Sequence, residues 1–448
     1  MNKFILFLRH AVALIRDDKL FSAIYIAGTA VAIASAMVIA IVFHIMLADI
    51  APESNRSRTL YVTNAFSLKS MLDSGGGIPS GASTALLDSV LRRMKSVELA
   101  TGFMPASWSR FPVADEQMGR TVDVVSMCCD PDFFRLYDLD FISGRPFSEQ
   151  EFRNGERVCV VSEKIARQLG NASQLMIPSL QDHPSLRVVG VVKTVSALMT
   201  NAAADIYIPY KIEGIGLYNA DHPDIEQVDY SGNLKTHVLL REGYSRQDFL
   251  DELEPLRQHY NAVTSAKLGD DVQWVVDADT HFFHIIGFFG RDNDQGLMER
   301  ARNLTVPAIL MLFFLLLPAI NLSGLVSNRM EARRAEMGIR KTFGAKRRTL
   351  LNEVISENLV LTLLGGAVGW VLSWVFISAV SESTVFMDMF GALDKPNAEM
   401  SLDFQMFFTP TLFLIAFVCC AVLNLMAALV PAWLSLRKPI VESLNQKR

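Results

Sequence analysis

The sequence predicts an α-helical membrane protein with four transmembrane helices and a large α+β extracytoplasmic domain between the first and the second helix. Three observations support this fold class. Half of the 448 residues are hydrophobic and the mean hydropathy is +0.26. The apolar residues gather in four runs without Lys, Arg, Asp or Glu, each long enough for the roughly 20 residues that cross a bilayer as a helix. A stretch of 255 residues with mixed composition separates the first run from the second.

The first uncharged run, residues 20–48, follows a basic N-terminal segment, residues 1–19. A secretory signal has an apolar core of roughly 7–15 residues, and this run is about twice as long. We therefore predict an uncleaved anchor rather than a cleaved signal. A helix of this length extends about 43 Å, whereas the hydrocarbon core is about 30 Å thick. The helix should therefore continue outward as a stalk.

Residues 49–303 are predicted to form the extracytoplasmic α+β domain. Runs rich in Val, Ile, Tyr and Trp between turn formers predict strands at residues 59–63, 121–127, 157–162, 186–195, 205–210, 237–240 and 272–278. The spacing of apolar residues predicts helices at 83–96, directly after Ser162, and at 245–260. Gly170 is a plausible helix stop, and the glycine-rich stretch 73–81 predicts a flexible loop.

The sequence offers no catalytic constellation. It contains no G-x-S-x-G, H-E-x-x-H or Walker motif. The stretch 73–81 lacks the G-K-[ST] ending of a phosphate loop, so we interpret it as a linker. His281 and His284 have a spacing that could bind a metal, but no third ligand is near them, and aromatic packing explains both better. We predict no catalytic, cofactor-binding or metal site, no enzyme activity in this chain and no nucleic-acid partner.

Five cysteines are too few for a disulfide-stapled fold. Cys128, Cys129 and Cys159 fall in the extracytoplasmic domain. Whether one disulfide forms, from Cys128 or Cys129 to Cys159, stays open. Cys419 and Cys420 lie in the last apolar run, where lipid contact or packing explains them.

The remaining elements follow from the apolar runs and the charges. We predict a second helix at 304–326, a cytoplasmic loop at 327–350, a third helix at 351–381, an outer loop at 382–406, a fourth helix at 407–433 and a cytoplasmic tail at 434–448. The N-terminal segment, the loop and the tail carry net charges of +2, +6 and +3, whereas the whole chain carries −5. The positive-inside rule therefore places both termini and the loop in the cytoplasm.

The cytoplasmic loop has an unusual form for a connection between two membrane helices. It carries eight basic side chains between residues 329 and 351. Residues 330–343 are predicted to form a short helix, Gly344 supplies a C-terminal stop, and a second helix begins at 346. A basic segment of this kind could simply bind anionic lipid. Lipid binding explains the charge, but it does not explain the compact helix–glycine–helix form.

Residues 321–373 resemble the permease domain of MacB/FtsX-type ABC transporters. The resemblance rests on "EMGIRKTFGA" followed by basic residues, and on Asn321, Glu357, Gly365, Gly366 and Gly369. Residues 129–148, 160–170 and 188–193 are similar to the exterior domain of that family, and residues 431–444 are similar to its ending. The match is looser just before "GIRK", and the exterior loops are variable and polar.

The resemblance implies a partner for the loop. In this family an ATPase binds the permease through the loop between the second and third helices, and the short helix is the coupling helix. The matching positions here are Glu336, Gly338, Ile339, Arg340, Lys341 and Gly344. Because no Walker motif is present, the resemblance implies a separate cytoplasmic ABC ATPase dimer that binds the ATP, and no cofactor on the permease itself.

The resemblance also implies a pair of permeases, either two copies of this chain or this chain with a homologue. Gly365 and Gly369 form a G-x-x-x-G pattern, which allows close helix approach. A face between two permeases is one interpretation of this pattern. The other is that glycine is simply common in membrane helices.

The implied function is mechanotransmission in the bacterial inner membrane. ATP binding would close the two permeases inside, and the stalks would move the outer domains to export or release a peptide, an antibiotic or a lipoprotein-like substrate. The alternative is an FtsX-like regulator that controls an extracytoplasmic partner such as a cell-wall hydrolase. A membrane sensor unrelated to ATPases is disfavoured, because no kinase, cyclase or DNA-binding domain is present. Membrane lipids and a periplasmic or outer-membrane protein are further candidate partners, and the substrate stays open.

Overall fold

The computed structural model describes residues 19–68, 78–104, 110–115, 120–177, 185–196, 199, 201–212, 230–268, 272–289, 342–380 and 410–437, together with residues 309, 324, 327, 328, 331, 337, 339 and 340. The chain divides into two compact units. We call Met1–His44, Leu304–Ser381 and Asp403–Arg448 the helical unit, and Ile45–Asn303 with Glu382–Leu402 the α+β unit.

Among its described residues the helical unit contains three long helices: α2 (Lys19–Leu47), whose last three residues belong to the α+β unit, α12 (Arg347–Val380) and α15 (Pro410–Arg437). The stretches Lys19–Leu47 and Arg347–Ala379 are long and apolar enough to cross a membrane. The three helices overlap the predicted spans at 20–48, 351–381 and 407–433. The predicted second span at 304–326 lies outside the described residues except for Ile309 and Gly324, so the number four stays a prediction.

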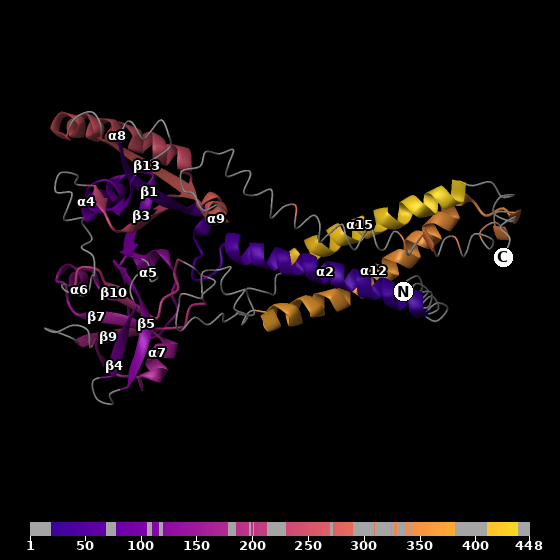
Figure 1. The fold of residues 1–448 in the computed structure, drawn as a ribbon, viewed down its shortest axis with the longest axis horizontal. Coiled ribbons are helices and arrows are strands. Elements are labelled where there is room, and N and C mark those ends of the chain that lie inside the picture. The colour runs from indigo at the N-terminus through magenta and orange to yellow at the C-terminus, as the bar shows by residue number, and fades with distance from the viewer. Residues whose placement is uncertain are drawn as a thin grey trace. The chain divides into compact units, whose positions relative to one another are not determined.

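One half of the α+β unit is an antiparallel sheet centred on β1 (Thr59–Leu68). β12 (Lys235–Leu240) and β13 (Val272–Thr280) flank β1, and β3 (Val97–Met104) pairs with β12. The long helix α8 (Arg246–Leu268) packs on β13 (Figure 1). Ser83 caps the short helix α4 (Thr84–Ser89) by accepting from the Leu86 amide, the usual reason for a Ser at this position. The core of this half includes Trp274, Leu86, Phe249 and Leu60.

The other half is a closed ring of six strands. Around the ring the order is β10 (Ile206–Pro209), β7 (Val158–Ser162), β9 (Ser185–Val192), β8 (Gln174–Met176), β4 (Arg110–Asp115) and β5 (Thr121–Cys129), which pairs again with β10. The helix α7 (Glu163–Gln168) contacts β7, β5 and β9. Closure leaves no free sheet edge between these strands, and the aliphatic core of the ring includes Val124, Ile165 and Ile206.

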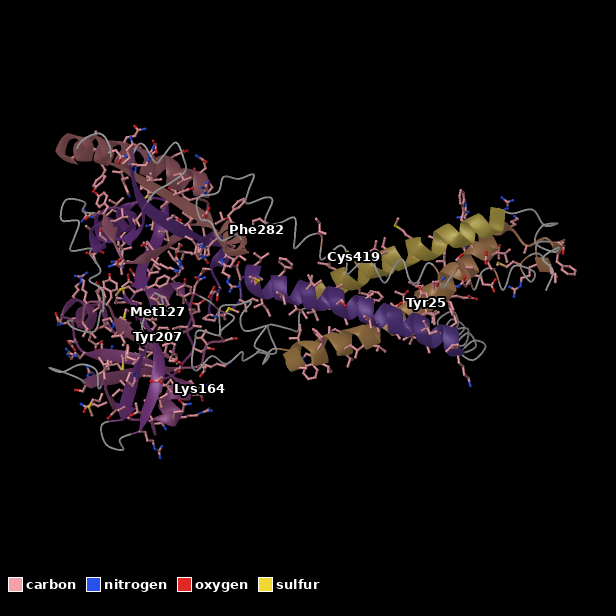
Figure 2. The ribbon with its side chains drawn as sticks, in the orientation of Figure 1. Tyr25, Met127, Lys164, Tyr207, Phe282 and Cys419 are labelled. Atoms are coloured by element: carbon pink, nitrogen blue, oxygen red, sulfur yellow. The ribbon has the colours of Figure 1, made fainter. Side chains whose placement is uncertain are left out.

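A third cluster joins the two halves. It combines residues of β3, β5, β10 and β12 with the short helix α5 (Phe133–Leu136). Met127 and Tyr207, which are labelled in Figure 2, belong to it, and Phe133 lies edge-on to Phe103 with ring centroids 5.4 Å apart. Because this aromatic cluster is shared between the halves, we treat the α+β unit as one body.

The seven strands predicted from sequence are confirmed, and Gly170 has the positive φ of a helix stop, +69°. Two expectations were wrong. The helix expected at 83–96 ends at Ser89 and is followed by a 3₁₀ turn, Leu91–Arg93. The last residues of the supposed loop 73–81 form β2 (Ile78–Ala82), and the others lie outside the described residues.

The structure also answers the question of a disulfide, which the sequence left open. Cys128, Cys129 and Cys159 are free and buried. The first two lie in the cluster shared between the halves, whereas Cys159 lies in the core of the ring. Burial raises the pKa of the Cys128 thiol to about 12, so this side chain is a neutral core residue rather than a reactive thiolate.

Candidate coupling site

The turn before α12 has the helix–glycine–helix form that the sequence predicts. The amide of Phe343 donates to Ile339 O at 3.2 Å, and the amide of Ala345 donates to Arg340 O at 3.0 Å. Gly344 between them has a φ of +90°, a conformation that L side chains rarely adopt. α12 then begins at Arg347. The glycine therefore ends one helical segment and lets the chain reverse into the next.

The turn has a packed side and an exposed side. Met337 is buried in a small cluster with Leu350 and Val354 of α12. On the exposed side, Ile339 is 50% exposed and Phe343 is 87% exposed. Single exposed apolar residues are common on protein surfaces. This pair, however, lies on the segment that, by the family resemblance, is expected to bind an ATPase, and an aromatic side chain is a frequent anchor of protein interfaces.

The predicted coupling residue Arg340 has a partner within its own chain. Its Nη1 atom lies 3.0 Å from both carboxylate oxygens of Glu353 on α12. The two side chains are 44% and 39% exposed, and exposed pairs of this kind contribute only about 0–1 kcal/mol. The pair thus links the turn to α12 but adds little to its stability. The other predicted positions, Glu336, Gly338 and Lys341, lie outside the described residues.

The G-x-x-x-G pattern lies against α2 of the same chain. A Cβ atom on Gly365 would lie 2.7 Å from the Cβ of Thr29, and one on Gly369 would lie 2.7 Å from the carbonyl oxygen of Ala30. Both distances are below any normal contact, so only glycine allows this approach. The close approach thus serves packing within one chain, and a face between two permeases stays a prediction.

The contact between α2 and α12 contains little hydrogen bonding. The hydroxyl groups of Tyr25, which is labelled in Figure 2, and Thr362 are 3.4 Å apart. The hydroxyl of Thr29 is fully buried and has no hydrogen-bond partner among the residues that the structure describes. We call this contact the seam and define it by Tyr25, Thr29, Ala30 and Ile33 of α2 with Thr362, Gly365 and Gly369 of α12.

The two histidines singled out in the sequence pack in the α+β unit, as expected. The ring of His284 stacks on Tyr61 with a centroid distance of 4.1 Å. The Nδ1 atom of His281 lies 2.6 Å from the hydroxyl of Tyr61. Within the described ranges, no group of three or more His, Cys, Asp or Glu side chains is arranged to hold a metal ion.

Sequence reasoning missed two features of the turn. The exposure of Phe343 depends on which side of the turn faces the helical unit, and the residues alone do not determine that side. The partner of Arg340 was missed because Glu353 is 13 residues away and lies on another helix. The basic residues that follow Gly344 give a strong signal for the loop but none for this pairing.

Comparison with known families assigns both parts of the chain. Residues 22–256, more than half of the chain, match the MacB-like periplasmic core domain. Residues 308–440 match the FtsX-like permease C-terminal domain. The first match covers most of the α+β unit, and the second covers the turn, α12 and α15.

Similar proteins include an uncharacterized ABC transporter permease, YknZ of Bacillus subtilis, which is 22% identical over 53% of each chain. The macrolide export ATP-binding/permease protein MacB of Pasteurella multocida is 24% identical over 74% of this chain and 44% of its own length. This chain therefore spans about half the length of these relatives. The crystal structure of the periplasmic region of MacB from Actinobacillus actinomycetemcomitans matches 52% of this chain and 94% of its own, with 12% identity and a TM-score of 0.33.

Proposed function

Because this chain belongs to the family of ABC transporter permeases that combine a MacB-like periplasmic core domain with an FtsX-like permease domain, we propose that it couples ATP hydrolysis by a separate cytoplasmic ATPase to motion of its α+β unit. In this proposal the chain spans the bacterial inner membrane four times, with both termini in the cytoplasm. The motion exports or releases a peptide, an antibiotic or a lipoprotein-like substrate. The relative named for macrolide export supports an antibiotic-like compound as one candidate.

The turn at residues 337–347 is the observation that carries this proposal. It is held on its inner side by Met337 and linked to α12 by the Arg340–Glu353 pair. On its outer side it presents Phe343, the most exposed large apolar side chain in the described part of the chain. A turn that is packed on its inner side and has an exposed aromatic tip fits a groove on a partner protein. A lipid anchor would need only the positive charge.

Co-purification with the ATPase tests the proposal. The tagged full-length protein is isolated from its native membrane, and a co-purifying protein with Walker motifs is identified by mass spectrometry. The variant Phe343→Ser removes the apolar tip without changing the charge of the turn. Because hot-spot residues at interfaces commonly contribute about 2 kcal/mol or more, the amount of bound ATPase should fall at least tenfold. ATP hydrolysis in the membranes is the second readout.

Two controls make this experiment specific. Ile142→Ser removes a similarly exposed apolar side chain, 54% exposed, from the α+β unit, and it should leave ATPase binding unchanged. Arg348→Gln removes one positive charge near the turn and preserves its shape. If Arg348→Gln reduces ATPase binding as much as Phe343→Ser does, the turn acts through its charge and the proposed docking is wrong.

A further inference from the structure

The end of the first membrane helix is bonded into the α+β unit by a buried polar network. The last four carbonyl groups of a helix have no partner within the helix, and they carry the negative end of its dipole. The Nη1 atom of Arg56 donates to Ile45 O at 2.6 Å and to Ala48 O at 2.9 Å. One guanidinium thus binds two carbonyls where α2 ends.

The same guanidinium is fixed from the other side by Glu53. Its Nε atom donates to the Glu53 carboxylate at 2.8 Å, and the two side chains are only 4% and 1% exposed. Glu53 also accepts the amides of Asn201 and Ala202, at 3.1 and 3.2 Å. Those amides belong to the segment that leads into β10. A buried charge pair is costly unless its remaining hydrogen bonds are made, and here they are made to the backbone at both ends.

A histidine provides the second connection. The Nε2 atom of His281 lies 2.6 Å from Met46 O. Because a carbonyl only accepts, Nε2 carries the hydrogen in the neutral ring, and Nδ1 accepts from the hydroxyl of Tyr61 on β1 at 2.6 Å. His281 is the first residue of α9 (His281–Phe289), which directly follows β13. The chain that leaves the α+β unit is therefore bonded to the chain that enters it.

These contacts bring four parts of the α+β unit to one point: the end of α2, the start of β1, the segment before β10 and the start of α9. Glu53, Arg56 and His281 are all buried. A loop that only connected a helix to a strand would not need a buried ion pair with backbone bonds to the end of α2 and to the segment before β10. Such a network resists rotation and displacement because each bond has a preferred direction.

We propose that Glu53, Arg56 and His281 form a joint that fastens the first membrane helix to the α+β unit, so that displacement of the helix moves this unit as one body. The three are positioning residues for the proposed mechanotransmission, and the inference rests on that proposed function. Without the joint, the helix would turn or slip at residues 48–55 and the α+β unit would lag behind it.

Pulsed electron resonance on the full-length complex with its ATPase tests the joint. Cys419, which is exposed on α15, is replaced by Ser. A spin label on Arg153→Cys, an exposed site, then reports the distance between the α+β units of two permeases without and with ATP.

Two variants weaken the joint. His281→Phe keeps an aromatic ring at this position but removes the hydrogen bond to Met46 O. Arg56→Lys preserves the charge but not the forked geometry. Both variants should hydrolyse ATP like the parent and lose most of the ATP-dependent distance change.

The controls separate this role from a contribution to folding. His281→Gln can still donate to Met46 O and should restore much of the distance change. His284→Phe, which alters a stacked neighbour without a bond to α2, should behave like the parent. Hydrogen exchange in the strands of the α+β unit should be the same in His281→Phe as in the parent.

Two outcomes would contradict the proposal. If the parent shows the ATP-dependent distance change and His281→Phe and Arg56→Lys show it fully as well, the proposed joint is wrong and the proposed function stands. A parent complex that shows no ATP-dependent change would overturn the proposed function and the joint with it.

Discussion

The two contact regions of α2 are built from opposite chemistry. At the joint, the helix end is held by a buried ion pair, a histidine and directed hydrogen bonds to backbone carbonyls. At the seam, the same helix meets α12 through glycines, Thr29 and Ala30, with one long hydroxyl contact between Tyr25 and Thr362. Directed bonds fix orientation. Packing of small residues fixes the distance between two helices but leaves displacement along the seam less costly.

The difference follows from the surroundings of each region. Within a membrane, lipid is as apolar as the side chains, so helices associate mainly through close packing of small residues. The joint belongs to the α+β unit, where charged and polar groups can be satisfied by neighbouring backbone. If the proposed function is right, the seam is the part that shifts and the joint is the part that holds.

The largest expected effect comes from breaking the ion pair at the joint. Arg56→Met leaves the Glu53 carboxylate buried without its partner, which should cost about 3–5 kcal/mol. The double variant Arg56→Met with Glu53→Gln removes the uncompensated charge and should recover part of this loss. Hydrogen exchange of β1 amides in the full-length protein measures both changes.

A nearby exposed pair provides the matched control. Arg58 pairs with Glu98 at 3.0 Å, with side chains 33% and 46% exposed. Arg58→Met should cost no more than about 1 kcal/mol. Equal losses for Arg56→Met and Arg58→Met would mean that burial gives the joint no special strength, and the comparison with the seam would lose its basis.

The next largest effect should come from adding a methyl group at the seam. Gly369→Ala places a Cβ 2.7 Å from Ala30 O. Because the obstacle is backbone, α2 and α12 must move apart, at a cost of about 1–3 kcal/mol. Gly324→Ala meets nothing within 4 Å and is the control. The thermal midpoint of the detergent-purified protein should fall for Gly369→Ala only, and an unchanged midpoint would show that the seam is loosely packed.

The helix–glycine–helix turn, the joint and the seam differ in how far sequence predicts them. The turn was predictable because Gly344 and the flanking helical patterns are local signals. The seven strands were predictable for the same reason, since alternation and β-branched residues are read within a few positions. The joint was not predictable, because Glu53 and Arg56 look like an ordinary exposed i, i+3 pair. Their burial depends on the segment around Asn201, which is 148 residues away.

The seam shows the same limit in another form. The sequence identified Gly365 and Gly369 as a site of close approach, but the pattern alone does not say which helix approaches. The structure places α2 of the same chain there. The question of a disulfide stayed open because the sequence shows that Cys128, Cys129 and Cys159 share a domain but not that they lie in separate cores.

Low pH should destabilise the region around three buried histidines, His237, His281 and His284, before it affects the seam. Burial and the charge of Lys235 lower the pKa of His284 to about 4, and burial lowers the pKa of His237 and His281. In the unfolded chain these side chains titrate near pH 6.5. The unfolded state therefore binds more protons between about pH 6.5 and pH 4, and stability should fall as the pH falls through this window.

The variant His284→Phe sharpens this prediction. It preserves a ring stacked on Tyr61 but removes one titrating group, so its loss of stability from pH 7 to pH 4.5 should be smaller than the parent's by roughly 1–3 kcal/mol. Hydrogen exchange of β1 and β13 at several pH values measures the difference. Identical pH profiles for the parent and His284→Phe would show that this histidine is not the group that titrates.

The smallest expected effect concerns the third kind of contact, the exposed pair Arg340–Glu353 at the turn. Reversing both charges, with Arg340→Glu and Glu353→Arg, preserves the pair and the net charge. Because each exposed pair contributes only about 0–1 kcal/mol, stability should barely change in the swapped protein or in Arg340→Glu alone.

ATPase co-purification with the same variants distinguishes two roles of Arg340. If Arg340 only orients the turn, Arg340→Glu should reduce ATPase binding modestly and the swap should restore it. If Arg340 itself touches the ATPase, the swap should bind as poorly as Arg340→Glu, and the contact with Glu353 would then be incidental to coupling.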